Sequence, residues 1–213
     1  MTVKTDQVKC FTRLATIPPV VAPLRDFNST LTILDWDDTL VCTSFLRVEA
    51  YPLANRQAIE QCDLVCMAAL DLLKVCLLHG RVIIITNSAT SWVKYAVNTF
   101  FPSFKAPLES IDVISARDLY SDAYPTDPAA WKRAAFRLLY MQETNLITVG
   151  DSVMDHEALC AIPVGQNLRK TVKFRSQPTP QDLVRQMTLL RDKFPEIVTS
   201  SRNMRITMTP RAF

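Results

Sequence analysis

The sequence predicts an α/β fold, a three-layer sandwich in which helices cover both faces of a mostly parallel central sheet. Three observations lead to this prediction. Short, continuous apolar runs alternate along the chain with longer segments that carry helix-capping residues. Several runs are rich in β-branched residues, which is typical of parallel strands buried on both faces. Polar residues follow several of the runs directly, at the strand ends where such sheets bind ligands.

Two strands and two helices are predicted in the N-terminal half of the chain. Residues 31–34 form a short apolar run that is typical of a buried strand. Asn55 can cap a helix that continues to about Leu78, shortly before a glycine that can end it. The β-branched run at 82–85 predicts a second strand. A helix is predicted over 91–101, and the proline that follows stops it.

Three further strands and two helices are predicted in the C-terminal half. Residues 111–114 are predicted to form the third strand, and residues 146–149, which a glycine follows, the fourth. Residues 172–174 predict a last short strand. The helix predicted over 127–141 begins with Asp-Pro, an N-cap followed by proline at the first helical position. The helix predicted over 179–194 begins with a pattern that resembles a capping box.

The chain divides into three predicted segments. Residues 1–28 show no clear period and contain several prolines, so we expect an extended arm. Residues 29–198 carry the strand–helix alternation and are long enough to form one domain with a sizeable core. Residues 199–213 form a basic C-terminal tail, and most such tails are solvated.

Composition narrows the class of protein. The chain has 24 Lys and Arg against 21 Asp and Glu, and the net charge of +3 is too small to predict nucleic acid binding. No apolar run approaches the length that spans a bilayer, so no membrane association is expected. The charged N-terminal residues are not followed by a continuous apolar block, which argues against a secretory signal. The 6 cysteines form no CxxC pair and suit a reducing compartment, so we expect a cytoplasmic protein.

Two aspartates follow the first predicted strand directly. Asp35 and Asp37 lie two residues apart, so their side chains can point into one crevice while Trp36 points away. Two carboxylates this close resist joint ionisation and normally need a cation, a shared proton or a substrate. The pair is therefore a candidate catalytic site. Asp38 is expected to point off the crevice or to cap the turn, and Thr39 to order the turn through its hydroxyl.

Two other predicted strands also end in polar residues. Thr86 and Asn87 come directly after the second strand, and Asp151 comes just after the fourth. Because the carboxyl ends of parallel strands meet at one edge of a sheet, these residues are expected to converge with Asp35. Asp155 lies about one helical turn after Asp151, so both carboxylates can face one point, as a Mg²⁺ site requires.

The order of these motifs resembles the haloacid dehalogenase-like (HAD) superfamily of phosphohydrolases, which has a Rossmann-like fold. The resemblance covers roughly residues 30–165. Lys132 belongs to the pattern because it precedes Asp151 by a spacing typical of the family and lies at the edge of the apolar stripe of its predicted helix. The matching residues are Asp35, Asp37 and Thr39, then Thr86 and Asn87, then Lys132, and finally Gly150, Asp151 and Asp155.

The resemblance implies a role for each residue. Asp35 would be the nucleophile that forms an aspartyl-phosphate, and Asp37 the general acid and then the general base. Thr86 and Asn87 would bind the phosphoryl oxygens, and Lys132 would offset the charge of Asp35 and of the phosphate. The implied cofactor is Mg²⁺. Its implied ligands are Asp35, Asp151 and the backbone carbonyl of Asp37, with Asp155 bound directly or through water.

Little of the chain is left over for a lid. Residues 41–80 are needed for a short loop and the crossover helix, and residues 88–131 for a helix, a strand and a loop. We therefore expect no substantial cap domain and an open crevice. Within the superfamily this resembles members that act on large substrates, such as phosphoproteins, or members whose partner subunit covers the site.

The favoured hypothesis is a Mg²⁺-dependent phosphatase that acts on a phosphorylated substrate, which can be a protein. One alternative is a non-catalytic interaction protein on the same fold. Another is a small-metabolite phosphatase or phosphotransferase that a partner subunit caps. A dehalogenase is less favoured, because those relatives lack an acid at the position of Asp37. A receiver domain places its phosphorylated aspartate on a later strand than its acidic pair. The substrate and the oligomeric state stay open.

Overall fold

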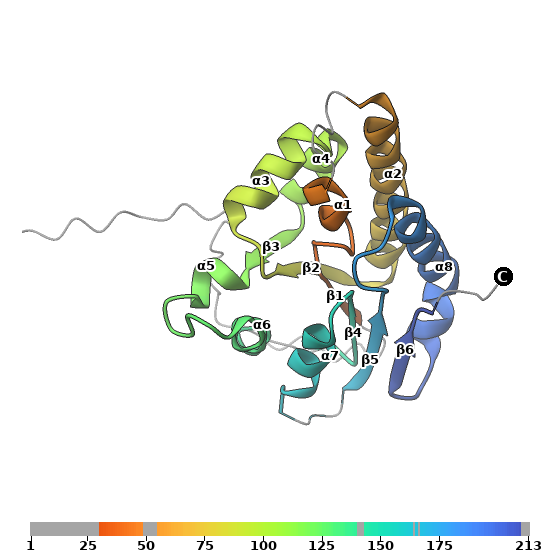
Figure 1. The fold of residues 1–213 in the computed structure, drawn as a ribbon. Helices are drawn as coiled ribbons and strands as arrows, with labels where there is room; N and C mark the ends of the chain where they lie inside the picture. Colours follow the sequence, from red (N-terminus) through yellow and green to blue (C-terminus); the bar gives the residue numbers. More distant parts are fainter. Residues whose placement is uncertain (1–29, 49–54, 140–142, 164, 166, 210–213) are drawn as a thin grey trace, which may run out of the picture.

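The computed structural model describes residues 30–48, 55–139, 143–163, 165 and 167–209. These residues form one six-stranded sheet in the order β3-β2-β1-β4-β5-β6, and every neighbouring pair of strands is parallel (Figure 1). The predicted α/β class with a parallel sheet is confirmed. The strands are β1 (Thr30–Leu34), β2 (Arg81–Thr86), β3 (Asp112–Ser115), β4 (Asn145–Gly150), β5 (Leu168–Lys173) and β6 (Met204–Thr207).

Helices cover both faces of the sheet (Figure 1). Each face of the sheet packs against its helices in a separate apolar core. Because side chains alternate along a strand, Leu31 and Ile33 of β1 pack with α5, α6 and α7, whereas Leu34 packs with α2, α3 and α8. The three predicted layers are therefore present. The helices are α1 (Thr43–Val48), α2 (Arg56–His79), α3 (Thr90–Thr99), the 3-10 turn η2 (Pro102–Phe104), α4 (Lys105–Glu109), α5 (Ala116–Tyr120), α6 (Pro128–Arg137), α7 (Val153–Cys160) and α8 (Pro180–Thr199).

The centre of the sheet brings the predicted polar strand ends together. The strand order reverses at β1, which lies between β2 and β4. Leu34 is in register with Ile84 of β2 and with Val149 of β4. The N–H of Asp35 donates to the carbonyl of Val149 at 2.9 Å, so the chain that leaves β1 stays beside the end of β4. Ligands bind at such reversal points in parallel sheets.

The segments that follow β1 and β2 form no separate layer in the described residues. Between β1 and β2 these residues form α1 and α2, and between β2 and β3 they form α3, η2 and α4. Each of these helices places side chains in or against the core that contains Leu34. The described part of the chain therefore contains no cap domain. The predicted N-terminal arm at 1–28 lies outside the described residues.

Most predicted helices occur with small shifts at their ends. Asn55 caps α2 by accepting from the N–H groups of Gln57 and Ala58 at 3.0 and 3.3 Å. Gly80 ends this helix at a φ of 150°, and a Cβ there would lie 2.1 Å from the carbonyl oxygen of Thr30. The helix predicted over 127–141 is α6, which ends at Arg137 because the next residues bond three positions back rather than four.

The strands at the C-terminal edge differ from the prediction. β5 begins at Leu168, four residues before the strand predicted at 172–174. The prediction began too late because the early positions of β5 carry charged side chains that hide the apolar pattern. β6 lies within residues 199–213, which were expected to be a basic tail. It pairs with β5 and alternates half-buried with exposed residues, but over only four positions. Such a short pattern is too weak to predict a strand.

Lys170 of β5 joins this edge of the sheet to the end of α8. Its side chain is fully buried, and its ammonium group lies within hydrogen-bond distance of the Asn145 side-chain oxygen and of three backbone carbonyls. Those carbonyls belong to Ile197, Val198 and Ser200, at distances of 2.6 to 2.9 Å. A lysine at a helix C-terminus satisfies the carbonyls that have no partner within the helix and opposes the negative end of its dipole.

Lys170→Met is expected to lower the free energy of unfolding by about 2–4 kcal/mol, because it leaves buried carbonyls without a donor. Chemical denaturation measures this change. Hydrogen exchange should accelerate first at residues 197–200 and in β6. An unchanged denaturation midpoint would contradict the capping role.

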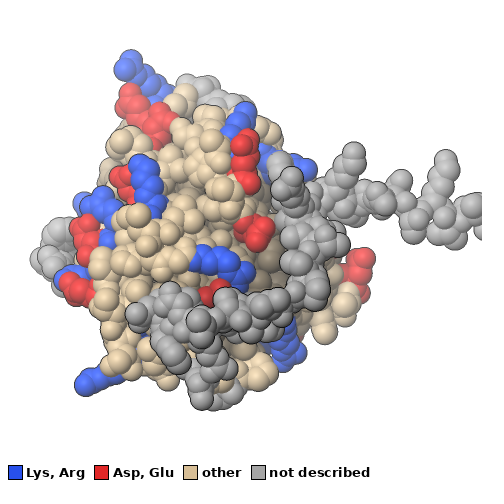
Figure 2. Space-filling view, turned by 180° about the vertical axis from the view of Figure 1, so that it is seen from behind, with Lys and Arg blue, Asp and Glu red and all other residues tan. Residues whose placement is uncertain are grey.

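The surface carries charges of both signs, and the described cysteines are unpaired. Figure 2 shows the face opposite to that of Figure 1, where basic and acidic side chains lie interspersed. In the described ranges, no helix is long and apolar enough to cross a membrane. The cysteines in these ranges are free thiols: Cys42, Cys62, Cys66, Cys76 and Cys160.

Candidate active site

A tight turn after β1 presents the two aspartates. The carbonyl of Trp36 accepts the N–H groups of Leu40 and Val41 at 3.0 and 3.2 Å, and Asp38 adopts a φ of 53°. The Trp36 side chain is fully buried against Phe104, with ring centroids 5.4 Å apart. The prediction that Trp36 points away from the aspartates is confirmed. The turn is held both by its own backbone bonds and by this aromatic anchor.

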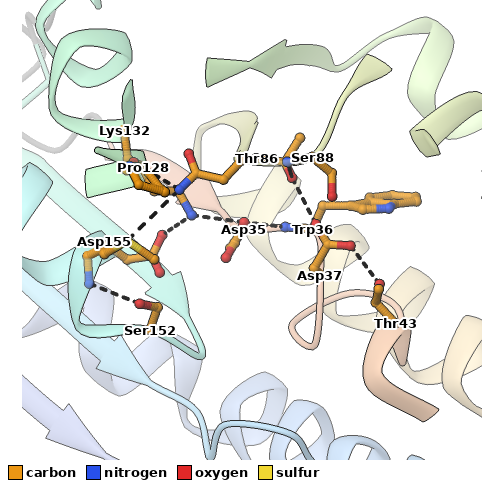
Figure 3. A network of polar contacts seen from close by, with 12 residues as sticks. Asp35, Trp36, Asp37, Thr43, Thr86, Ser88, Pro128, Lys132, Ser152 and Asp155 are labelled. Carbon is orange, nitrogen blue, oxygen red and sulfur yellow. Dashed lines mark hydrogen bonds and ion pairs between the residues drawn. The ribbon is translucent and has the colours of Figure 1, made fainter. Parts of the chain in front are cut away.

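Lys132 lies between two buried carboxylates, as Figure 3 shows. Its Nζ is 2.9 Å from Oδ1 of Asp35 and 2.6 Å from Oδ1 of Asp155 (Figure 3). The three side chains come from α6, from the end of β1 and from α7, and the lysine side chain is 1% exposed. Oδ1 of Asp35 also accepts the N–H of Trp36 at 2.8 Å. Both of these contacts of the Asp35 carboxylate are thus on Oδ1, and no residue in the described part of the chain hydrogen-bonds its Oδ2.

The charges of this buried group depend on one another. Burial raises the pKa of Asp35 well above its ordinary value; Lys132 lowers it, and Asp155 and Asp37 raise it further. Burial alone would lower the pKa of Lys132, but the carboxylates of Asp155 and Asp35 outweigh burial and raise it. Lys132 therefore stays protonated and is the cation that allows two buried carboxylates to lie side by side.

Gly150 makes room for the Asp155 carboxylate. A Cβ at position 150 would lie 2.1 Å from Oδ2 of Asp155, so any other residue there would displace this buried carboxylate. The same oxygen is buried and has no hydrogen-bond partner in the described residues. The close approach of a carboxylate therefore explains the glycine that ends β4, and one oxygen of that carboxylate lacks a partner in the described residues.

Asp37 belongs to a separate set of contacts. Its Oδ1 accepts the hydroxyl of Thr43 at 2.7 Å and the indole N–H of Trp92 at 3.0 Å. Its Oδ2 accepts the hydroxyl of Thr86 at 3.1 Å (Figure 3). Asp37 therefore lies near Asp35 and raises its pKa, but the two side chains have different partners.

The second strand contributes through its last residue and the turn that follows. The Thr86 hydroxyl donates to Asp37 and accepts the N–H of Ser88 at 2.9 Å. The Asn87 amide donates to the carbonyl of Pro128 at 3.0 Å, so it links the end of β2 to the first turn of α6. Thr86 is thus placed beside Asp37, whereas the Asn87 side chain is directed at the helix that carries Lys132.

Asp38 and Thr39 act differently from each other in the turn. The Asp38 carboxylate accepts the backbone N–H of Ser44 at 2.8 Å and also its hydroxyl, so it links the turn to the first residues of α1. The expectation for Thr39 is wrong in the described residues, because its buried hydroxyl has no partner there. Its backbone N–H, 3.4 Å from the carbonyl of Trp36, closes the turn instead.

Asp151 is the last member of the acidic cluster, which we define as Asp35, Asp37, Asp38, Asp151 and Asp155. Burial, together with the charges of Asp38 and Asp155, raises the pKa of Asp151 from 3.8 to about 7, although Lys132 and Lys173 lower it. Within the described ranges its carboxylate makes no hydrogen bond and no ion pair; only its backbone carbonyl is bonded, to the Ser176 hydroxyl at 2.7 Å. Burial and the neighbouring negative charges therefore favour the protonated form of Asp151 more than the two lysines favour the ionised form.

The aspartates of the site raise the question of whether the described residues could hold a cation. No three His, Cys, Asp or Glu side chains among them form a group that could hold a metal ion. Mg²⁺, however, is commonly bound by one or two carboxylates together with waters and substrate oxygens. The free oxygen of Asp155, the unpaired carboxylate of Asp151 and the mutual repulsion of the acidic residues are consistent with such a site.

Several residues of the site were missed by sequence analysis. Thr43 and Trp92 hold Asp37, and Ser44 holds Asp38. They lie 6, 55 and 6 positions from their partners, on helices that the motif pattern does not mark. The polar residues at the start of α1 and the tryptophan in the first turn of α3 were the available signals.

The fold and the site together define an α/β protein with a buried lysine and an acidic cluster at the carboxyl edge of a parallel sheet. No model of a known protein family matches the chain, and no curated protein matches it either.

Proposed function

We propose that this protein is a HAD-like, Mg²⁺-dependent phosphatase that hydrolyses a phosphomonoester. The observation that carries the proposal is the buried contact of Lys132 with both Asp35 and Asp155 at the end of β1. Burying two carboxylates and an ammonium group costs free energy, and hydrophobic residues of similar volume would fill the same space without that cost. A nucleophilic carboxylate with one oxygen held and the other free gives this arrangement a chemical purpose.

The proposed reaction proceeds in two displacements. Oδ2 of Asp35 attacks phosphorus while the bond from phosphorus to the leaving oxygen breaks, and Asp37 donates a proton to that oxygen. Asp37 then takes a proton from a water molecule whose oxygen attacks the aspartyl-phosphate. The bond between phosphorus and Asp35 breaks, so inorganic phosphate leaves and the carboxylate is restored.

The other residues hold charge and position. Lys132 favours the ionised form of Asp35 and orients it through Oδ1, and its charge offsets that of the incoming phosphate. The hydroxyl of Thr86 donates to Asp37 in this structure and would turn its proton to a phosphoryl oxygen. Asn87 would bind the same group through its backbone N–H, since its side-chain amide donates to Pro128. One such donor is typically worth about 10²–10³ in rate.

Mg²⁺ would be held by Asp35, Asp151 and the backbone carbonyl of Asp37, with Asp155 bound directly or through water. When bound, the ion would stabilise the negative charge on the phosphoryl oxygens. The substrate we favour is large, such as a phosphoprotein, because the described residues between β1 and β3 form no cap layer. A small metabolite would need a partner subunit to cover the crevice.

The test is a screen of the purified full chain against p-nitrophenyl phosphate, phosphopeptides and phosphorylated metabolites, with Mg²⁺ and with EDTA. We expect turnover with Mg²⁺ and none with EDTA. Saturable Mg²⁺ binding without turnover of any of these compounds would instead support the non-catalytic interaction protein.

Mg²⁺ binding should depend on pH through Asp151. An acid whose pKa rises on folding destabilises the fold as it ionises, so the metal-free protein should lose stability as pH rises from about 4 towards about 7. Mg²⁺ binds the ionised form and should offset this loss. We expect added Mg²⁺ to raise Tm more at pH 8 than at pH 5.5, and Asp151→Asn should remove most of that difference. An equal rise at both pH values would contradict a role for Asp151 as ligand.

A further inference from the structure

The side chain of Asp37 is surrounded by three donors from three separate elements. Thr43 begins α1, Thr86 ends β2 and Trp92 lies in the first turn of α3. Their polar hydrogens point at one carboxylate over distances of 2.7 to 3.1 Å. Only Thr86 belongs to the motif pattern, so the functions of Thr43 and Trp92 are not explained by it.

The donors are divided unequally between the two oxygens of Asp37. Oδ1 accepts from Thr43 and Trp92, whereas Oδ2 accepts only from Thr86. An indole N–H can donate but cannot accept, so Trp92 requires Oδ1 to be an acceptor in every protonation state. Oδ1 therefore already has two partners and Oδ2 only one, which favours Oδ2 as the oxygen that carries a transferable proton.

The two unexplained donors are themselves held firmly. Thr43 is buried, at the start of a helix that packs into the core. The Trp92 ring lies 5.9 Å from the ring of Tyr95, and the first N–H of α3 donates to the Asp118 side chain at 2.8 Å. A carboxylate bonded to such donors cannot rotate without losing two hydrogen bonds.

We propose that Thr43 and Trp92 are positioning residues that fix the Asp37 carboxylate with Oδ2 directed at the leaving oxygen. The proposal rests on the proposed phosphatase function, since it describes how the general acid is oriented. Neither residue touches the substrate. Each acts through Asp37, by saturating Oδ1 and preventing rotation of the carboxylate.

The test compares two substrates that differ in how much they need the acid. The p-nitrophenolate ion leaves without protonation, whereas the phenolate of phenyl phosphate leaves well only when it is protonated. Trp92→Phe keeps the ring and removes the N–H. It should lower kcat/KM for phenyl phosphate by about 10–100-fold and for p-nitrophenyl phosphate by less than about threefold.

A second pair of variants guards against misfolding. Thr43→Val removes the hydroxyl at nearly constant shape and should show the same selective loss, while Thr43→Ser should restore the wild-type ratio between substrates. Trp131→Phe is the matched control, because it removes an indole N–H that donates to the carbonyl of Tyr124 at 2.6 Å, not to Asp37. The control should leave the ratio unchanged.

The possible outcomes distinguish failure of the positioning role from failure of the phosphatase function. Equal losses on both substrates, or a Thr43→Ser variant that behaves like Thr43→Val, would overturn the positioning role and leave the phosphatase proposal intact. Wild-type protein that hydrolyses neither compound nor any other phosphoester, while it binds Mg²⁺, would overturn both proposals.

Discussion

Asp35→Asn is expected to abolish turnover, with a fall in kcat on the order of 10⁵-fold or more, because the amide cannot form an acyl phosphate and covalent catalysis ends. Steady-state kinetics with p-nitrophenyl phosphate and Mg²⁺ measure this loss. A residual rate within about tenfold of wild type would rule out Asp35 as nucleophile.

The same substitution should not weaken the metal-free fold. Burial and the charges of Asp155 and Asp37 oppose ionisation of Asp35, so a neutral amide removes a repulsive charge while Lys132 keeps its bond to Asp155. We expect a Tm equal to or above that of wild type in EDTA. A large fall in Tm would show instead that Asp35 serves mainly to hold the fold.

Lys132→Met should have the largest effect on stability. It leaves Asp35 and Asp155 buried without their cation, and breaking such a pair typically costs about 3–5 kcal/mol. Turnover should also be lost, since the charge that orients Asp35 is gone. Urea denaturation in EDTA and the phosphatase assay measure the two effects.

Two variants control this experiment. Lys74→Met removes a lysine whose contact with Asp71, 3.0 Å long, is exposed, and should change stability by less than about 0.5 kcal/mol. Lys132→Met combined with Asp155→Asn should recover part of the lost stability, because fewer buried charges stay unpaired. A double variant less stable than Lys132→Met alone would contradict the electrostatic explanation.

The central part of the fold was predictable because its signals are local. The strands β1, β2 and β4 each contain a continuous apolar run. The helices α2 and α6 are preceded by Asn55 and Asp127, residue types that cap helices through local hydrogen bonds. Asp35 follows its strand directly, so its position at the sheet edge needs only the chain direction. These features depend on neighbours in sequence, and the structure places them where the pattern indicated.

The edge of the sheet was not predictable for the opposite reason. Lys170 looks like a surface residue, yet it is fully buried because the end of α8 brings backbone carbonyls to it. β6 is too short to be recognised from its own pattern, and its pairing with β5 is what makes it a strand. Both features arise from contacts between distant parts of the chain.

The order of residues along the chain was enough to predict the α/β class and to group Asp35, Lys132 and Asp155 in one site. The partners of each carboxylate, in contrast, depend on tertiary packing. It joins Asp35 and Asp155 through Lys132, and it gives Asp37 to Thr43, Thr86 and Trp92. The physical reason is that a strand end fixes where a side chain begins, whereas its hydrogen bonds depend on which helices pack beside it.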